Sequence, residues 1–277
     1  MAGKNLKSRR AALIRPFVQV FFFVLIGAIS VNHYLEESGA ALPWLSSASL
    51  HSVCPFGGVV SIYQLFVTGT FVKKVHESSM VLMGIVFVLA LLFGPVFCGW
   101  ICPFGAFQEW LAKIGRKIFK RRYNRFMPRR LDSVLRYARY LLLAQVIYMT
   151  AKSGVLVFAE ADPYYALFNF WTGEVALAGY VFLGATALLS LFVERPFCKY
   201  ACPYGAVLGI TNLFRVFAVK RNKATCIDCK ACDRACPMNI EVSASGTVRN
   251  HQCVSCLKCT SEQECPIADT VVFGAGK

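Results

Sequence analysis

The sequence predicts a mainly α membrane protein, with four transmembrane helices in two pseudo-repeats and a small α+β domain at the C-terminal end. Composition is the first reason, because 56% of the 277 residues are apolar and 16% are charged, against about a quarter charged in a soluble domain. The others are a repeated cysteine motif and eight cysteines near the C-terminus. We expect two domains, residues 1–220 in the membrane and residues 221–277 in the cytoplasm.

Four apolar stretches are long enough, with their flanks, to cross a bilayer, which takes about 20 residues. They cover residues 17–31, 80–97, 140–158 and 175–193. A fifth stretch, residues 56–72, is rich in Gly, Ser and Thr and follows Cys54-Pro55, so we expect a re-entrant or interfacial helix there. A cleaved signal peptide is the alternative for the first stretch, because basic residues precede it and small residues follow it.

The distribution of charge agrees with four crossings. Residues 1–16 carry five basic side chains, residues 98–136 carry ten with two acids, and the segment after Glu194 carries eleven with six acids. Residues 159–174 carry three acids and no base. Basic segments stay in the cytoplasm, so we expect a multi-pass protein of the bacterial inner membrane with both termini in the cytoplasm. The net charge of +15 then indicates topology and contact with the lipid bilayer, and no nucleic-acid partner.

Residues 97–106 recur as residues 197–206, each copy reading Phe-Cys-x-x-x-Cys-Pro-aromatic-Gly-Ala. Two cysteines four residues apart share a helix face, and the Pro after them marks a break or a new first turn. Related by a pseudo-two-fold axis, the two copies would direct four thiols toward each other near the cytoplasmic surface. These are Cys98, Cys102, Cys198 and Cys202. We expect an additional iron–sulfur centre there, with redox-active thiols, a partner contact or buried apolar packing as alternatives.

The eight C-terminal cysteines form two cassettes of the bacterial ferredoxin type. The first has the spacing Cys-x-x-Cys-x-x-Cys-x-x-x-Cys-Pro, and the second has a longer last gap. Three thiolates of one loop and the fourth of the other cassette hold each cluster in this arrangement. The spacing therefore predicts one [4Fe–4S] cluster on Cys226, Cys229, Cys232 and Cys265. It predicts a second on Cys253, Cys256, Cys259 and Cys236.

Zinc is the alternative metal, since paired Cys-x-x-Cys units also form structural zinc sites. The third cysteine and the Cys-Pro ending, present twice, favour iron and sulfur. Met238, Ile240 and Ile267 are expected to pack over the clusters. Because so small a domain buries little apolar core, ligation should supply much of its folding free energy.

Taken together, these features resemble the NapH family of membrane polyferredoxins, a superfamily that also contains NosR, CcoG and MauN. The resemblance covers nearly the full chain and rests on Cys98, Cys102, Pro103, Cys198, Cys202, Pro203 and the tail cysteines. It implies a ferredoxin-like C-terminal domain and a component of a quinol dehydrogenase that acts in a complex. The expected function is electron transfer between the quinone pool and a protein redox partner on the periplasmic or cytoplasmic side.

Two alternatives use the same clusters. The chain could supply electrons for metal-cofactor assembly or for maturation of another enzyme, or it could be a redox sensor whose inner cysteines form a disulfide. Smaller signals add little to the choice. We expect an interfacial role for His51, a turn role for Asp162, and a solvated helix face for Gln108 and Glu109, with hydrogen bonding to a quinone as the alternative for the last two. The basic run 113–130 is expected to bind lipid headgroups.

Overall fold

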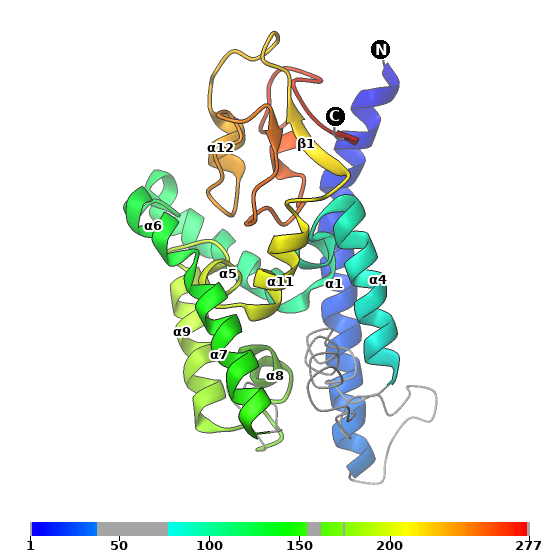
Figure 1. The fold of residues 1–277 in the computed structure, drawn as a ribbon, viewed down its shortest axis with the longest axis vertical. Helices are drawn as coiled ribbons and strands as arrows, with labels where there is room; N and C mark the ends of the chain where they lie inside the picture. Colours follow the sequence, from blue (N-terminus) through cyan, green and yellow to red (C-terminus); the bar gives the residue numbers. More distant parts are fainter. Residues whose placement is uncertain (1, 38–76, 154–161, 174, 276–277) are drawn as a thin grey trace.

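The structure, a computed structural model, describes residues 2–37, 77–153, 162–173 and 175–275. His51, Cys54 and the helix expected at residues 56–72 lie outside these residues. Figure 1 shows an elongated molecule with a body of helices at one end and the small cysteine-rich domain at the other. The N-terminus and the last strand both lie at the end that carries the small domain.

Each of the four expected spans coincides with a helix. These helices are α1 (Ala2–Glu37), α4 (Glu77–Phe93), α7 (Ala138–Ser153) and α9 (Leu177–Ser190). In the described part of the chain, α1 alone contains an apolar segment long enough to cross a membrane, Ile14–Leu35, while Val81–Phe93 and Leu177–Ser190 are shorter apolar helices. The second helix ends before the expected residue 97 because Gly94 adopts a left-handed φ of +80° and Pro95 follows it. By the length of its apolar segment, only α1 among the described helices is able to cross a membrane.

The long helices present large apolar side chains on the outside of the body. Phe17 and Leu141 are each 74% exposed, and Leu177 is 78% exposed. Apolar surface on this scale marks contact with another protein or with a membrane.

Further helices connect these four, and all but α5 are short. They are the π-helix η1 (Phe97–Ile101), α5 (Pro103–Phe119), the 3-10 helix η2 (Lys120–Arg122), α6 (Arg129–Leu135), α8 (Pro163–Phe168), α10 (Pro196–Tyr200) and α11 (Pro203–Thr211). Asp162 caps α8 by accepting a hydrogen bond from the Tyr164 N–H at 3.0 Å. The turn role expected for Asp162 is therefore confirmed.

The repeat in the sequence is also a repeat in the structure. Cys102 N–H donates to the Phe97 carbonyl at 2.8 Å, and Cys202 N–H donates to the Phe197 carbonyl at the same distance. Each of these cysteines is the N-cap of a new helix, α5 or α11, whose first turn contains the following proline. Proline suits this position because the first N–H of a helix has no intrahelical partner. Of the two expected roles for the proline, a new first turn is the one observed.

The tail domain is built on a three-stranded antiparallel sheet of order β2-β1-β3. The strands are β1 (Phe217–Arg221), β2 (Thr247–Val248) and β3 (Val271–Ala275), and α12 (Ala231–Ala235) and the 3-10 helix η4 (Lys258–Thr260) follow the two cysteine loops. Val219 pairs with Val248 on one side and with Phe273 on the other. Its side chain contributes to a small apolar cluster with Met238, Ile240 and Val242. The cysteine loops thus surround a core only a few side chains wide.

Candidate iron–sulfur sites

The two cysteine loops of the tail share an uncommon backbone conformation. Asp228 and Lys230 have φ of +52° and +54°, and at the equivalent positions Ser255 and Leu257 have φ of +47° and +57°. Positive φ in non-glycine residues is rare and costs about 1–3 kcal/mol each. Alternating left- and right-handed residues direct successive N–H groups into one concavity, an arrangement typical of Fe–S sites. Both loops therefore have the backbone of an anion cradle.

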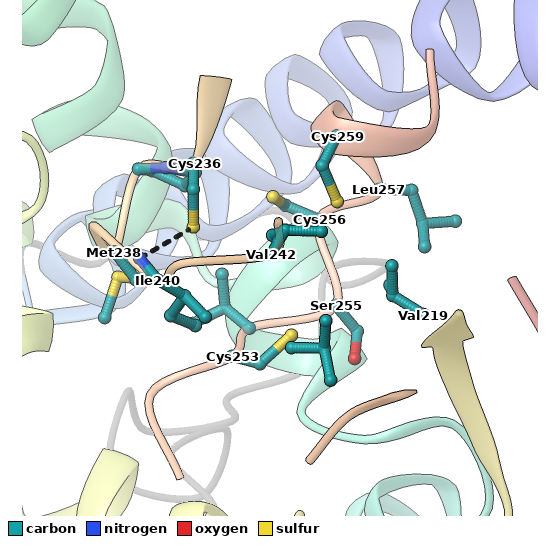
Figure 2. A pocket seen from close by; sticks show the side chains of 13 residues that line it. Val219, Cys236, Met238, Ile240, Val242, Cys253, Ser255, Cys256, Leu257 and Cys259 are labelled. Carbon is teal, nitrogen blue, oxygen red and sulfur yellow. Dashed lines mark hydrogen bonds between the residues drawn. The ribbon is translucent and has the colours of Figure 1, made fainter. Parts of the chain in front are cut away.

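One of the expected ligand sets surrounds a cavity in the tail domain. Cys236, Cys253, Cys256 and Cys259, here called the proximal thiols, line it together with apolar side chains that include Val219, Met238, Ile240, Val242 and Leu257. Figure 2 shows the four sulfur atoms around this space. The Ile240 N–H donates to Cys236 Sγ at 3.4 Å. The packing of Met238 and Ile240 at this site is therefore as expected, while Ile267 is 37% exposed.

Burial makes the proximal thiols difficult to ionise on their own. It raises the pKa of Cys236 to about 12, and the neighbouring Cys256 and Cys253 add to the effect. Burial likewise raises the pKa of Cys259 well above its usual value, with further contributions from the other proximal thiols. Four mutually repelling thiolates become favourable only where cations share the site, as iron does.

The second expected set, here called the distal thiols, lies nearer the surface. Cys226 and Cys265 are partly buried, Cys229 is exposed and Cys232 is buried. Burial, Asp233 and the thiol of Cys265 together raise the pKa of Cys232 to about 11, so the structure brings Cys232 and Cys265 together across the two cassettes. The longer last gap is taken up by a turn, in which the Cys265 N–H donates to the Ser261 carbonyl at 2.9 Å.

The four cysteines of the repeat, here called the inner thiols, also meet. Burial raises the pKa of Cys98 and Cys202, and in each case the other inner thiols raise it further. The Gly205 N–H donates to Cys202 Sγ at 3.2 Å, and Gln108 Nε2 donates to Cys198 Sγ at 3.5 Å. The inner thiols are therefore half-buried and close enough to interact electrostatically, while the pseudo-two-fold arrangement and the additional centre stay predictions.

The tail domain rests directly on the first inner motif. A side chain at Gly99 would collide with the carbonyl oxygen of Val254 and would lie 3.4 Å from Cys256 Cα. Trp100 Nε1 donates to the Ser255 carbonyl at 3.1 Å. Cys98 itself packs against the apolar cluster that lines the proximal cavity. The first inner motif and the loop that carries the proximal thiols are thus in direct contact.

A buried ionic cluster joins the body to the tail, and it corrects the expected solvated face for Gln108 and Glu109. Gln108 is fully buried and Glu109 is 4% exposed. Glu109 pairs with Arg15 at 2.6 Å, Lys258 at 2.5 Å and Arg195 at 2.9 Å. Burial raises the pKa of Glu109, but Arg195, Lys258 and Arg15 lower it further, so the net pKa lies well below the usual value. The Glu109 carboxylate is therefore ionised, and its contacts are with this chain's own cations.

Arg195 occupies the space between the inner and proximal thiols. It has a left-handed φ of +53°, which is uncommon for arginine, and its side chain is fully buried. Arg195 Nη1 donates to the Cys98 carbonyl at 2.5 Å. Burial lowers the pKa of Arg195, but Glu109 and the thiols of Cys198 and Cys256 raise it. The guanidinium is therefore charged and lies close to both sets of thiols.

Several buried cationic side chains lack hydrogen-bond acceptors for some of their N–H groups. A site that surrounds an anionic group should contain such cations. Within the part of the chain that the structure describes, Nε of Arg139, Arg195 and Arg215 is buried without a hydrogen-bond acceptor. Among the described residues, no carboxylate pairs with Arg139 or Arg215. Burying unpaired charge is costly, and clusters held by four thiolates carry net negative charge. The residues present therefore fit iron–sulfur clusters.

A single metal ion fits less well. Within the described ranges, no group of three or more His, Cys, Asp or Glu side chains is spaced to hold one ion. In a cubane each thiolate binds a different iron, so the thiols surround the group at a wider spacing. The sequence interpretation missed the cations altogether, because it counted Arg195, Lys199, Arg215 and Lys258 toward membrane topology.

Known proteins share this arrangement. The family model described as a 4Fe-4S binding domain matches residues 75–122 and 175–222, one match for each repeat. YccM of Escherichia coli (strain K12), described as a proposed electron transport protein, is 33% identical over 254 residues, covering 88% of this chain and 69% of YccM. The ferredoxin-type protein NapH of Haemophilus influenzae is 28% identical, covering 63% of this chain and 61% of NapH.

NosR of Stutzerimonas stutzeri, a regulatory protein, is 32% identical over 64% of this chain, which corresponds to 25% of NosR. No solved structure matches the chain. The chain is also similar to the proteins NirI and MauN. The chain therefore belongs to the membrane-associated family of iron–sulfur electron-transfer proteins that includes NapH, NirI, NosR, MauN and YccM.

Proposed function

We propose that the chain passes electrons between the quinone pool and a protein redox partner, as a component of a quinol dehydrogenase. The observation that carries this proposal is the order of the three sets of thiols. Cys229 of the distal set is exposed, the proximal thiols line a cavity in the tail, and the first inner motif lies against the backbone of the proximal loop. Such an order gives an electron a short route from the aqueous surface to the membrane.

In this proposal the distal and proximal thiols each hold one [4Fe–4S] cluster, and the inner thiols hold an additional iron–sulfur centre. Bound clusters supply one-electron reduction and oxidation. The chain's own residues hold these groups close together, exclude water from the proximal cavity with Met238, Ile240 and Val242, and surround the buried thiols with cations. The two matches to a 4Fe-4S binding domain contain the inner thiols and support the additional centre.

The proposed membrane placement has four crossings and both termini in the cytoplasm. It is supported by the exposed apolar side chains of α1, α4, α7 and α9 and by the two ends of the chain, which lie at the same end of the molecule (Figure 1). The basic side chains of residues 113–130 would then face the anionic lipid headgroups of the inner leaflet. The quinone would exchange electrons with the inner centre from the bilayer side.

Proteoliposomes test this proposal. Quinol should bleach the visible absorbance of wild-type protein under anaerobic conditions, and Cys198→Ser should slow bleaching at least tenfold because it removes an inner thiol. Cys54→Ser, a cysteine outside the three sets, is the matched control and should behave as wild type. Clusters that dithionite reduces but quinol does not would contradict the quinol dehydrogenase role and favour electron supply to maturation of another enzyme.

A further inference from the structure

Arg215 is a fully buried cation in direct contact with the proximal thiols. Its Nη1 donates to Ser255 Oγ at 3.0 Å and to Cys253 Sγ at 3.5 Å, and its Nη2 donates to the Val248 carbonyl. The side chain has 0% exposure, and among the described residues no carboxylate pairs with it. Its charge therefore has no carboxylate counterpart in the described ranges.

Other cations near the proximal cavity add to the positive electrostatic potential that Arg215 creates there. Arg195 and Lys199 are each fully buried, and Lys258 follows the loop residue Leu257. Acids accompany these three, since Arg195 and Lys258 pair with Glu109, and Lys199 lies 3.4 Å from an oxygen of Asp132. Arg15 and Arg116 also take part in this network, so four cations share the two carboxylates of Glu109 and Glu194.

The distal thiols have the opposite surroundings. Arg221 Nη1 donates to Cys226 Sγ at 3.2 Å, but it also pairs with Asp228 at 3.0 Å, and the Asp228 side chain is 76% exposed. A second carboxylate, that of Asp233, lies 3.8 Å from Cys232 Sγ. Cys229 is exposed to solvent. Acids and water thus accompany the distal site, whereas unbalanced cations accompany the proximal one.

Charge and solvent exposure are among the factors that set the reduction potential of an iron–sulfur cluster. Reduction adds one negative charge, which a buried cation stabilises strongly because the surrounding dielectric is low. A neighbouring acid opposes reduction, and solvent screens exposed charges. We propose that Arg215 sets the order of the two tail sites, so that the proximal cluster has a higher reduction potential than the distal cluster. An electron in the tail then settles beside the inner thiols.

This inference rests on the proposed function only in requiring both tail clusters, so the experiment uses the full chain and does not require quinol. Purified protein is titrated with mediators and dithionite under EPR spectroscopy. Cys229→Ser identifies the distal signal, because it changes a thiol of that site alone. In wild type the proximal cluster should be reduced first, and raising the salt concentration should shift only the exposed distal midpoint.

Arg215→Gln removes the charge and keeps a hydrogen-bonding side chain. At the potential where half of the wild-type proximal cluster is reduced, the reduced-to-oxidised ratio in this variant should fall at least tenfold, equal to a shift of 59 mV for one electron. Arg215→Lys keeps the charge and should stay within threefold of wild type. Arg221→Gln is the matched control, and the proximal midpoint should not change in it.

Two results would overturn the inference. One is a distal cluster that is reduced first in wild type, a measurement that does not depend on the folding of any variant. The other is an unchanged proximal midpoint in Arg215→Gln at full iron content. Failure of the proposed function is distinguishable from both, since it would appear as absent clusters or as clusters that quinol cannot reduce.

Discussion

Lys258 Nζ, in the cysteine-rich tail, lies 2.5 Å from Glu109 Oε1, on a helix of the body. Lys258 stands between Cys256 and Cys259 in the tail, and Glu109 lies on α5 of the body. Burial lowers the pKa of Lys258, but Glu194 and Glu109 raise it, so the net pKa is above the usual value. This ion pair therefore ties the position of the proximal loop to the helix that follows the first inner motif.

Replacing Glu109 should weaken the contact between α5 and the loop that carries the proximal thiols. Glu109→Gln leaves Arg15, Arg195 and Lys258 with one shared carboxylate fewer, and removing one partner of a buried ion pair costs about 3–5 kcal/mol. We expect a matching loss of stability in urea unfolding in detergent, together with faster amide exchange across residues 253–259. Arg129→Gln is the control, because the pair of Arg129 with Glu241 is exposed and such pairs contribute little. Equal stability of the two variants would contradict this account.

Gly99 should tolerate no side chain. Gly99→Val would place its Cβ against the Val254 carbonyl, and since backbone cannot move aside cheaply, the tail should separate from the inner motif. Limited proteolysis should then cleave the tail at least tenfold faster than in wild type. Gly84→Ala is the control, because a Cβ at this position in α4 meets no described residue within 4 Å. Protease resistance of Gly99→Val at the wild-type level would show that the domains do not meet there.

Asp132 should stabilise the protein over a wide range of pH. Burial raises the pKa of Asp132, but Lys199, Tyr200 and Arg136 lower it further, so the net pKa is below 3.8. A lowered carboxylate pKa contributes stability that is complete above the unfolded value and is lost only as pH falls through the folded value. Asp132→Asn should therefore lower the free energy of unfolding by the same amount at every pH from 8 to 5.

Urea unfolding of wild type and Asp132→Asn at pH 8, 6.5 and 5 checks this expectation. A stability difference that shrinks already between pH 8 and pH 5 would mean that the folded pKa of Asp132 is raised. Asp228→Asn serves as the comparison, because its side chain is 76% exposed and its removal should change the free energy of unfolding little.

Local spacing was sufficient to predict the backbone of the cysteine motifs. The Cys-x-x-Cys-x-x-Cys pattern imposes the same left-handed positions on both tail loops, at Lys230 and at Leu257, and the Cys-Pro pair starts a helix at both Pro103 and Pro203. These features depend on neighbours a few residues away. For that reason the repeat and the form of the cysteine loops could be predicted from sequence.

The buried charges could not be predicted in the same way. The prediction of membrane topology counts every lysine and arginine of a segment, whether its side chain is exposed or buried. The sequence therefore did not indicate that Arg195 and Arg215 are buried. Their burial depends on segments far away in sequence: Arg215 contacts the segment 248–255, and Arg195 contacts Cys98 and Glu109. Glu109 is buried for the same reason, although α5 taken alone is amphipathic enough to favour an exposed face.

Metal content tests the central claim most directly. Iron, acid-labile sulfide and zinc should be measured per chain in anaerobically purified full-length protein, with Cys253→Ser and Cys226→Ser as variants. We expect more than eight irons with as many sulfides: eight from two tail cubanes, and either about two or about four more from an inner two-iron or four-iron centre. Each variant should lose about four irons. A count near eight would contradict the inner centre, and fewer than eight irons, or zinc in their place, would contradict the whole account.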